Sequence, residues 1–133
     1  MVRESEGIRG GRFARTALFA VLAGGWGQEV FGNIEDPVLA VPFFLASTLA
    51  VLALGHELHT QARRRSPVTA NRWEGTDTAI VAVLVGLALA TCVALASRSF
   101  TPSEQSIRAS YAAMYVLLAG CFGLARRATL AAR

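Results

Sequence analysis

Four apolar runs separated by arginine clusters constrain this chain more than any other feature. The runs cover residues 16–33, 37–56, 78–97 and 108–126, approximately, and few charged side chains interrupt them. A helix of about 20 apolar residues crosses the roughly 30 Å of hydrocarbon in a bilayer. The sequence therefore predicts an all-α, polytopic membrane protein. It forms one domain, a bundle of four transmembrane helices.

The arginines predict an orientation for this bundle. All 13 basic residues are arginine, and eleven lie before the first run, between the second and third runs, or after the fourth. Only Arg98 and Arg108 lie on the other side. Because basic residues concentrate in cytoplasmic segments, we expect both termini in the cytoplasm. Arginine without lysine, together with abundant alanine, glycine and valine, suggests a G+C-rich bacterial genome and hence the bacterial cytoplasmic (inner) membrane.

The formal net charge of +4 needs an explanation. In a soluble protein, clustered basic residues would raise the possibility of nucleic-acid binding. Here the arginines flank apolar runs, where such residues orient helices and contact anionic headgroups. The sequence therefore predicts the lipid bilayer as a partner, and no nucleic acid.

Polar residues at one depth suggest a candidate intramembrane site. Glu29, beside Gln28, lies roughly 18 Å along its helix from the cytoplasmic edge, counting 1.5 Å per residue. An ionisable side chain at such a depth is expensive and by default suggests a function. The same counting brings Thr91, Tyr115 and Arg108 to this level or just above it. Such a layer could hold a proton, a cation or the polar head of a ligand.

A second interpretation of this region is structural. Gly24, Gly25, Gly27 and Gly32 weaken the first helix. If the helix ends near Gly27, then Glu29 lies in the outer interface, where it faces headgroups or pairs with an arginine.

His56 and His59 form a second cluster at the end of the second run. Residues three apart share a helix face, and neutral imidazole is a common metal ligand. Only Glu57, Glu74 and Asp77 could complete a metal site. The favoured interpretation is an interfacial helix end, where histidine suits the negative end of the helix dipole. The sequence identifies no cofactor.

Small residues recur at four-residue spacing in the third run, at Ala82, Gly86, Ala90 and Ala94. Shorter pairs occur in the first run (20 and 24) and in the fourth (119 and 123). Small residues let helix backbones approach closely in lipid. Packing within the bundle is the favoured interpretation, and homo-oligomerisation or docking to other membrane subunits is the alternative.

These features favour a non-enzymatic membrane component, either an accessory or structural subunit of a larger complex or a self-associating scaffold. The first alternative is a small homo-oligomeric transporter or channel that uses Glu29. The second is a membrane enzyme that acts on a lipid or apolar substrate, with Glu29 and Tyr115 as acid and base. No substrate, ion or partner can be identified from these residues.

Overall fold

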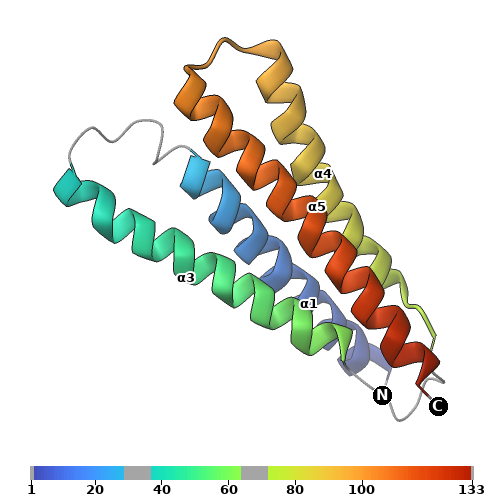
Figure 1. The fold of residues 1–133 in the computed structure, drawn as a ribbon. Coiled ribbons are helices and arrows are strands. Elements are labelled where there is room, and N and C mark those ends of the chain that lie inside the picture. The colour runs from blue at the N-terminus through green and yellow to red at the C-terminus, as the bar shows by residue number, and fades with distance from the viewer. Residues whose placement is uncertain (1, 29–36, 64–71, 133) are drawn as a thin grey trace.

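All the secondary structure in the described part of this chain is helical. The computed structural model describes residues 2–28, 37–63 and 72–132. The helices of the bundle are shown in Figure 1. They are α1 (Val2–Val21), which continues into a π-helical turn (Leu22–Trp26), α3 (Pro37–Ala62), α4 (Gly75–Ser97) and α5 (Pro102–Ala131). The predicted all-α class is confirmed.

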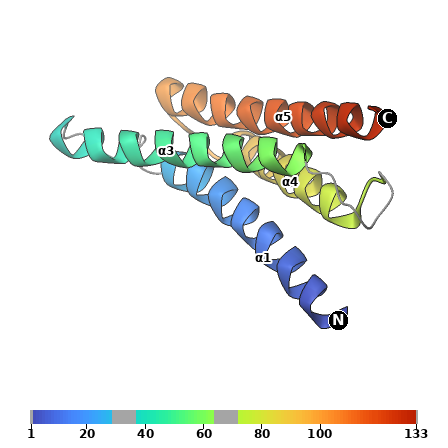
Figure 2. The ribbon, with the colours of Figure 1, turned by 90° about the horizontal axis from the view of Figure 1, so that it is seen from below.

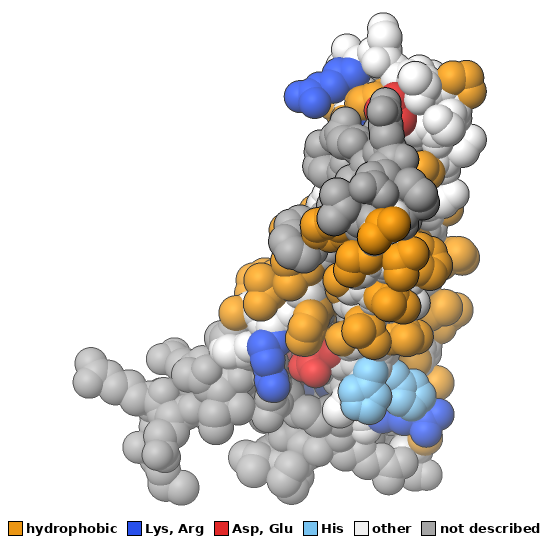
Figure 3. Space-filling view, turned by 90° about the vertical axis from the view of Figure 1, so that its left-hand side faces the viewer, with side chains coloured by type: hydrophobic (Ala, Val, Ile, Leu, Met, Phe, Trp, Pro, Cys, Tyr) orange, Lys and Arg blue, Asp and Glu red, His pale blue; other side chains and the backbone are white. Residues whose placement is uncertain are grey.

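Three of these helices are long and apolar enough to cross a membrane. They are α4, α5 and the Val41–Ala62 part of α3. On the face shown in Figure 3, hydrophobic side chains form a central band, and histidine and charged side chains lie beyond its ends. The chain is therefore a multi-pass membrane protein.

The first predicted span differs from the other three. Within the described residues, the apolar stretch of α1 and the π-helical turn covers Phe13–Gly25, which is short for a membrane span. Residues 29–33, which we assigned to the same span, lie outside the described residues. The structure thus supports three of the four predicted spans by length and composition.

The helices extend beyond the apolar runs that predicted them. Helix α5 begins at Pro102 instead of near residue 108, and α3 continues to Ala62 instead of ending near residue 56. At the start of α5, the Thr101 N–H donates to Glu104 Oε2 over 2.8 Å, and the Glu104 N–H donates back to Thr101 Oγ1 over 3.4 Å. This capping box stabilises a polar first turn that hydropathy alone does not reveal.

Helices α4 and α5 form an antiparallel pair joined by a short turn (Figure 1). Each helix buries five residues along one face. Because the chain reverses near Thr101, the two sets are expected to meet in opposite order, and in three of the five pairs alanine lies opposite a larger side chain. The pairs expected at each level are Asp77 with Arg126, Ile80 with Phe122, Leu84 with Ala119, Ala88 with Tyr115, and Thr91 with Ala112.

Helix α1 enters the bundle only with its second half. Figure 2 shows its N-terminal end diverging from the other helices. Further along, Ala20 and Ala23 are fully buried in a core that α3, α4 and α5 also supply. Their small side chains permit close helix packing, and Ala20 belongs to the pair at 20 and 24 for which we predicted it.

The small residues of α4 face the opposite way from our favoured prediction. Ala82, Gly86 and Ala90 are exposed, and nothing lies within 4 Å of a Cβ placed on Gly86. The buried face of α4 is the one that carries Asp77, which pairs with a residue of α5. Since that contact fixes the rotation of α4, packing of Ala82, Gly86 and Ala90 within the bundle is the wrong prediction, while Ala94, the last residue of the predicted stripe, is half-buried.

Candidate functional site

Three of the predicted site residues meet near the end of the bundle where α4 turns into α5. Gln28 follows the π-helical turn and is 9% exposed. Its Nε2 donates to Thr91 Oγ1 on α4 over 3.4 Å, and its Oε1 accepts from Arg108 Nη1 on α5 over 3.3 Å. The amide of one side chain thus links three helices, and the predicted polar layer contains Gln28, Thr91 and Arg108.

Arg108 brings a positive charge to this layer. Its guanidinium carbon lies 4.3 Å from the centre of the Phe100 ring, in cation–π geometry. The Phe100 ring and the Gln28 amide therefore hold the guanidinium at the edge of the apolar band. A cation fixed in this way favours an anionic or strongly polar group beside it.

Tyr115 lies deeper than this layer and has a different role. It is 1% exposed, and its hydroxyl donates to the backbone carbonyl oxygen of Ala20. Ala20 lies just before the π-helical turn, where the hydrogen-bonding pattern of α1 changes. Tyr115 therefore ties α5 to the backbone of α1. Glu29, the remaining member of the predicted layer, lies outside the described residues.

Two glycines of the first helix provide the space for two tyrosines of α5. A Cβ on Gly24 would lie 1.8 Å from the Tyr115 hydroxyl oxygen, and one on Gly27 would lie 2.0 Å from the Tyr111 hydroxyl oxygen. Tyr111 also hydrogen-bonds Ser47 on α3, with 2.9 Å between the hydroxyl oxygens. The chain stays helical through residue 28. These glycines thus mark a close helix contact. The sequence pattern predicted such a contact for Gly24, as part of the pair at 20 and 24, and for Gly27 it indicated only a weakened helix.

A buried ion pair forms a second polar contact, nearer the other end of the bundle. Arg126 Nε lies 3.0 Å from Asp77 Oδ2, and the two residues are 7% and 6% exposed. The same Asp77 oxygen accepts the Glu74 N–H over 3.0 Å, which caps α4. The sequence pattern placed Arg126 only among the flanking arginines. The antiparallel order of α4 and α5 is the signal that places it beside Asp77.

A smaller polar contact joins α1 to α3. Thr16 is 1% exposed, and its Oγ1 accepts from Gln61 Nε2 over 2.8 Å. The Gln61 amide also donates to Glu57 Oε1 over 2.9 Å. This contact, like the previous one, uses polar side chains to hold helices together.

His56 and His59 lie in the last two turns of α3, and both are exposed. In residues 2–28, 37–63 and 72–132, no group of three or more His, Cys, Asp and Glu side chains is placed to hold a metal ion. Two of the residues that could have completed such a site have other partners, because Asp77 pairs with Arg126 and Glu57 accepts from Gln61. A metal site at the two histidines stays a prediction.

In comparisons with known proteins, the chain matches no family model, no curated protein and no solved structure.

Proposed function

We propose that this protein is a non-enzymatic membrane component that works by helix–helix association, either with copies of itself or as an accessory subunit of a membrane complex. The observation that carries the proposal is the outward face of α4. Ala82, Gly86 and Ala90 lie exposed along it, one turn apart. Small residues at this spacing allow another helix to approach closely, and such contacts drive association in lipid.

The partners of the interior polar groups support a structural role. The Tyr115 hydroxyl donates to a backbone carbonyl, and the Asp77 carboxylate pairs with Arg126. A general acid or base needs a proton that can reach a substrate. Groups engaged in this way hold helices together instead.

The same proposal includes a location and an orientation. Helix α1 begins and α5 ends at the same end of the molecule (Figure 1). Arg72 and Arg127 are exposed in segments that lie at this end. With the positive-inside rule, these positions support an orientation with both termini in the cytoplasm. The arginine-rich, lysine-free composition is the support for a bacterial inner membrane.

The experiment is a mass measurement by light scattering on the protein purified in mild detergent. We expect the wild type to elute as a homo-oligomer or with a fixed partner. Gly86→Leu should weaken that association by roughly 5- to 150-fold, because one bulky side chain in a close contact costs about 1–3 kcal/mol. Gly120→Leu is the matched control, since a Cβ on Gly120 also meets nothing within 4 Å and Gly120 lies on α5. A wild type that is monomeric and without a partner would refute the proposal.

A small transporter or channel is the second candidate function, and the layer of Gln28, Thr91 and Arg108 favours it. Polar side chains from three helices converge there, next in sequence to Glu29. A coupling carboxylate must gain and lose a proton or bind an ion. If the protein is a transporter or channel, Glu29→Gln should therefore abolish transport of the substrate or ion. If it works by helix–helix association, the Glu29→Gln variant should keep the oligomeric mass of the wild type.

A further inference from the structure

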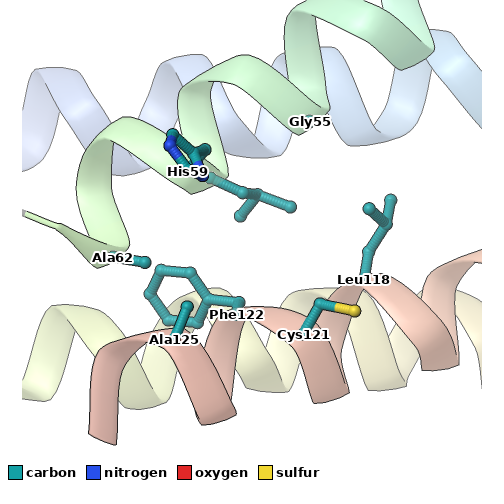
Figure 4. A pocket seen from close by; sticks show the side chains of 8 residues that line it. Gly55, His59, Ala62, Leu118, Cys121, Phe122 and Ala125 are labelled. Carbon is teal, nitrogen blue, oxygen red and sulfur yellow. The ribbon is translucent and has the colours of Figure 1, made fainter. Parts of the chain in front are cut away.

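An apolar groove runs between α3 and α5 and opens on the surface of the bundle. Its volume is about 170 Å³, and its walls include Leu58 on α3 and Leu118 and Phe122 on α5. Figure 4 shows Gly55 along one wall, opposite Leu118. A Cβ on Gly55 would meet nothing within 4 Å, so the missing side chain helps to keep the groove open.

The groove leads toward the charged end of α3. His59 lines the groove on the side of Ala62 (Figure 4), and Ala125 lines both this groove and a neighbouring hollow of about 400 Å³. Arg63, which is exposed, lines that second hollow together with Thr129. The two spaces therefore adjoin at Ala125, and together, as a path, they lead from apolar walls to a basic end.

No carboxylate lines either space among the described residues. Glu57, on the same helix, accepts the Gln61 amide, which also reaches α1. Asp77 pairs with Arg126 between α4 and α5. The arginine at the end of the path is thus the charged group that a ligand in the groove would meet.

We propose that this path is a binding site for one anionic phospholipid. An acyl chain would lie between α3 and α5 against Leu58, Leu118 and Phe122, and the headgroup phosphate would meet Arg63. A phospholipid fits this arrangement. Its apolar acyl chain matches the apolar walls, and its anionic phosphate follows at the basic end. Basic pockets between transmembrane helices are known to bind anionic headgroups. This inference does not depend on the proposed function.

The test is native mass spectrometry of the purified chain in detergent micelles that contain equal amounts of phosphatidylglycerol and phosphatidylcholine with identical acyl chains. We expect the wild type to retain phosphatidylglycerol about fivefold more often than phosphatidylcholine, because one basic residue near an anionic headgroup contributes about this much. Arg63→Gln should bring the two lipids to nearly equal retention. Arg98→Gln is the control, because Arg98 is exposed and follows the C-terminal end of α4, away from Arg63. This variant should leave the preference unchanged.

A second pair of variants tests the groove itself. Gly55→Leu should fill it and lower the retention of both lipids. Gly120→Leu is the control. A Cβ on Gly120 also meets nothing within 4 Å, and Gly120 lines a different hollow, beside α4. Helical content by circular dichroism confirms that each variant folds. Equal retention of both lipids by the wild type, an unchanged preference in Arg63→Gln, or equal losses in the two glycine variants would overturn the proposal.

Discussion

Gly24→Ala should destabilise this protein although alanine is the better helix former. The added methyl carbon would lie 1.8 Å from the Tyr115 hydroxyl oxygen and 2.6 Å from the ring carbon that carries it. Tyr115 is 1% exposed, so its ring has little space to move into. The ring must shift, and the hydrogen bond to the Ala20 carbonyl oxygen is then lost.

Three contributions set the size of the effect. Overpacking a well-packed core costs about 1–3 kcal/mol. Leaving a buried hydroxyl or carbonyl without its partner costs about 1–3 kcal/mol. Replacing glycine by alanine in a helix contributes about 1 kcal/mol in the opposite direction. The free energy of unfolding of Gly24→Ala should therefore fall by about 3 kcal/mol.

The neighbouring glycine is a control of matched chemistry. A Cβ on Gly25 would find Val21 Cγ1 as its nearest atom, at 3.9 Å, which is an ordinary contact. Gly25→Ala should therefore leave the stability unchanged or raise it by up to about 1 kcal/mol. Adding Tyr115→Phe to Gly24→Ala removes the closest clashing atom, so the double variant should lose less stability than the sum of the two single changes.

The assay is unfolding by titration of protein in mild detergent with sodium dodecyl sulfate, followed by circular dichroism. The expected order of stability is Gly25→Ala at or above the wild type, and Gly24→Ala well below it. If Gly24→Ala is as stable as the wild type, or if both variants lose the same amount, the close contact between α1 and α5 does not have this geometry.

The same titration tests two further contacts. Asp77→Ala leaves the buried guanidinium of Arg126 without its carboxylate, and it should cost about 3–5 kcal/mol. Adding Arg126→Leu should recover most of that loss, and a double variant as unstable as Asp77→Ala would contradict the ion-pair explanation. Ser47→Ala removes the hydrogen bonds to Tyr111 and to the Ala23 carbonyl oxygen, and it should cost about 1 kcal/mol. Thr48→Ala is its control, since the Thr48 hydroxyl donates to the Phe44 carbonyl oxygen within its own helix; equal losses would contradict the role of Ser47.

Hydropathy predicted most of this fold because three helices carry a clear signal. The helical class and the cores of α3, α4 and α5 follow from the length of the apolar runs. The helix ends did not follow, because α5 gains a polar first turn from the capping box of Thr101 and Glu104. Capping depends on hydrogen bonds between a few side chains and the backbone, and a hydropathy average does not detect them.

The candidate site was predicted in part, and the missing part depends on helix rotation. Depth counting placed Gln28, Thr91 and Tyr115 in one layer. The structure joins Thr91 to Gln28 as expected, but it directs the Tyr115 hydroxyl to the backbone of α1. Depth follows from residue number, whereas the direction of a side chain depends on which faces of the helices pack together. The exposed Gly86 was assigned to the interior for the same reason.

The contact between Tyr115 and α1 has a consequence for the order in which the helices insert and fold. Ala20 and Tyr115, which this contact joins, are separated by 95 positions in the chain. A ribosome releases the first helix well before it completes the last. Within the described residues, the apolar stretch of α1 and the π-helical turn covers Phe13–Gly25, and this shorter stretch favours insertion less than those of α3, α4 and α5. The last step of folding should therefore be the packing of α1 onto α5, after the tyrosines of α5 have left the ribosome.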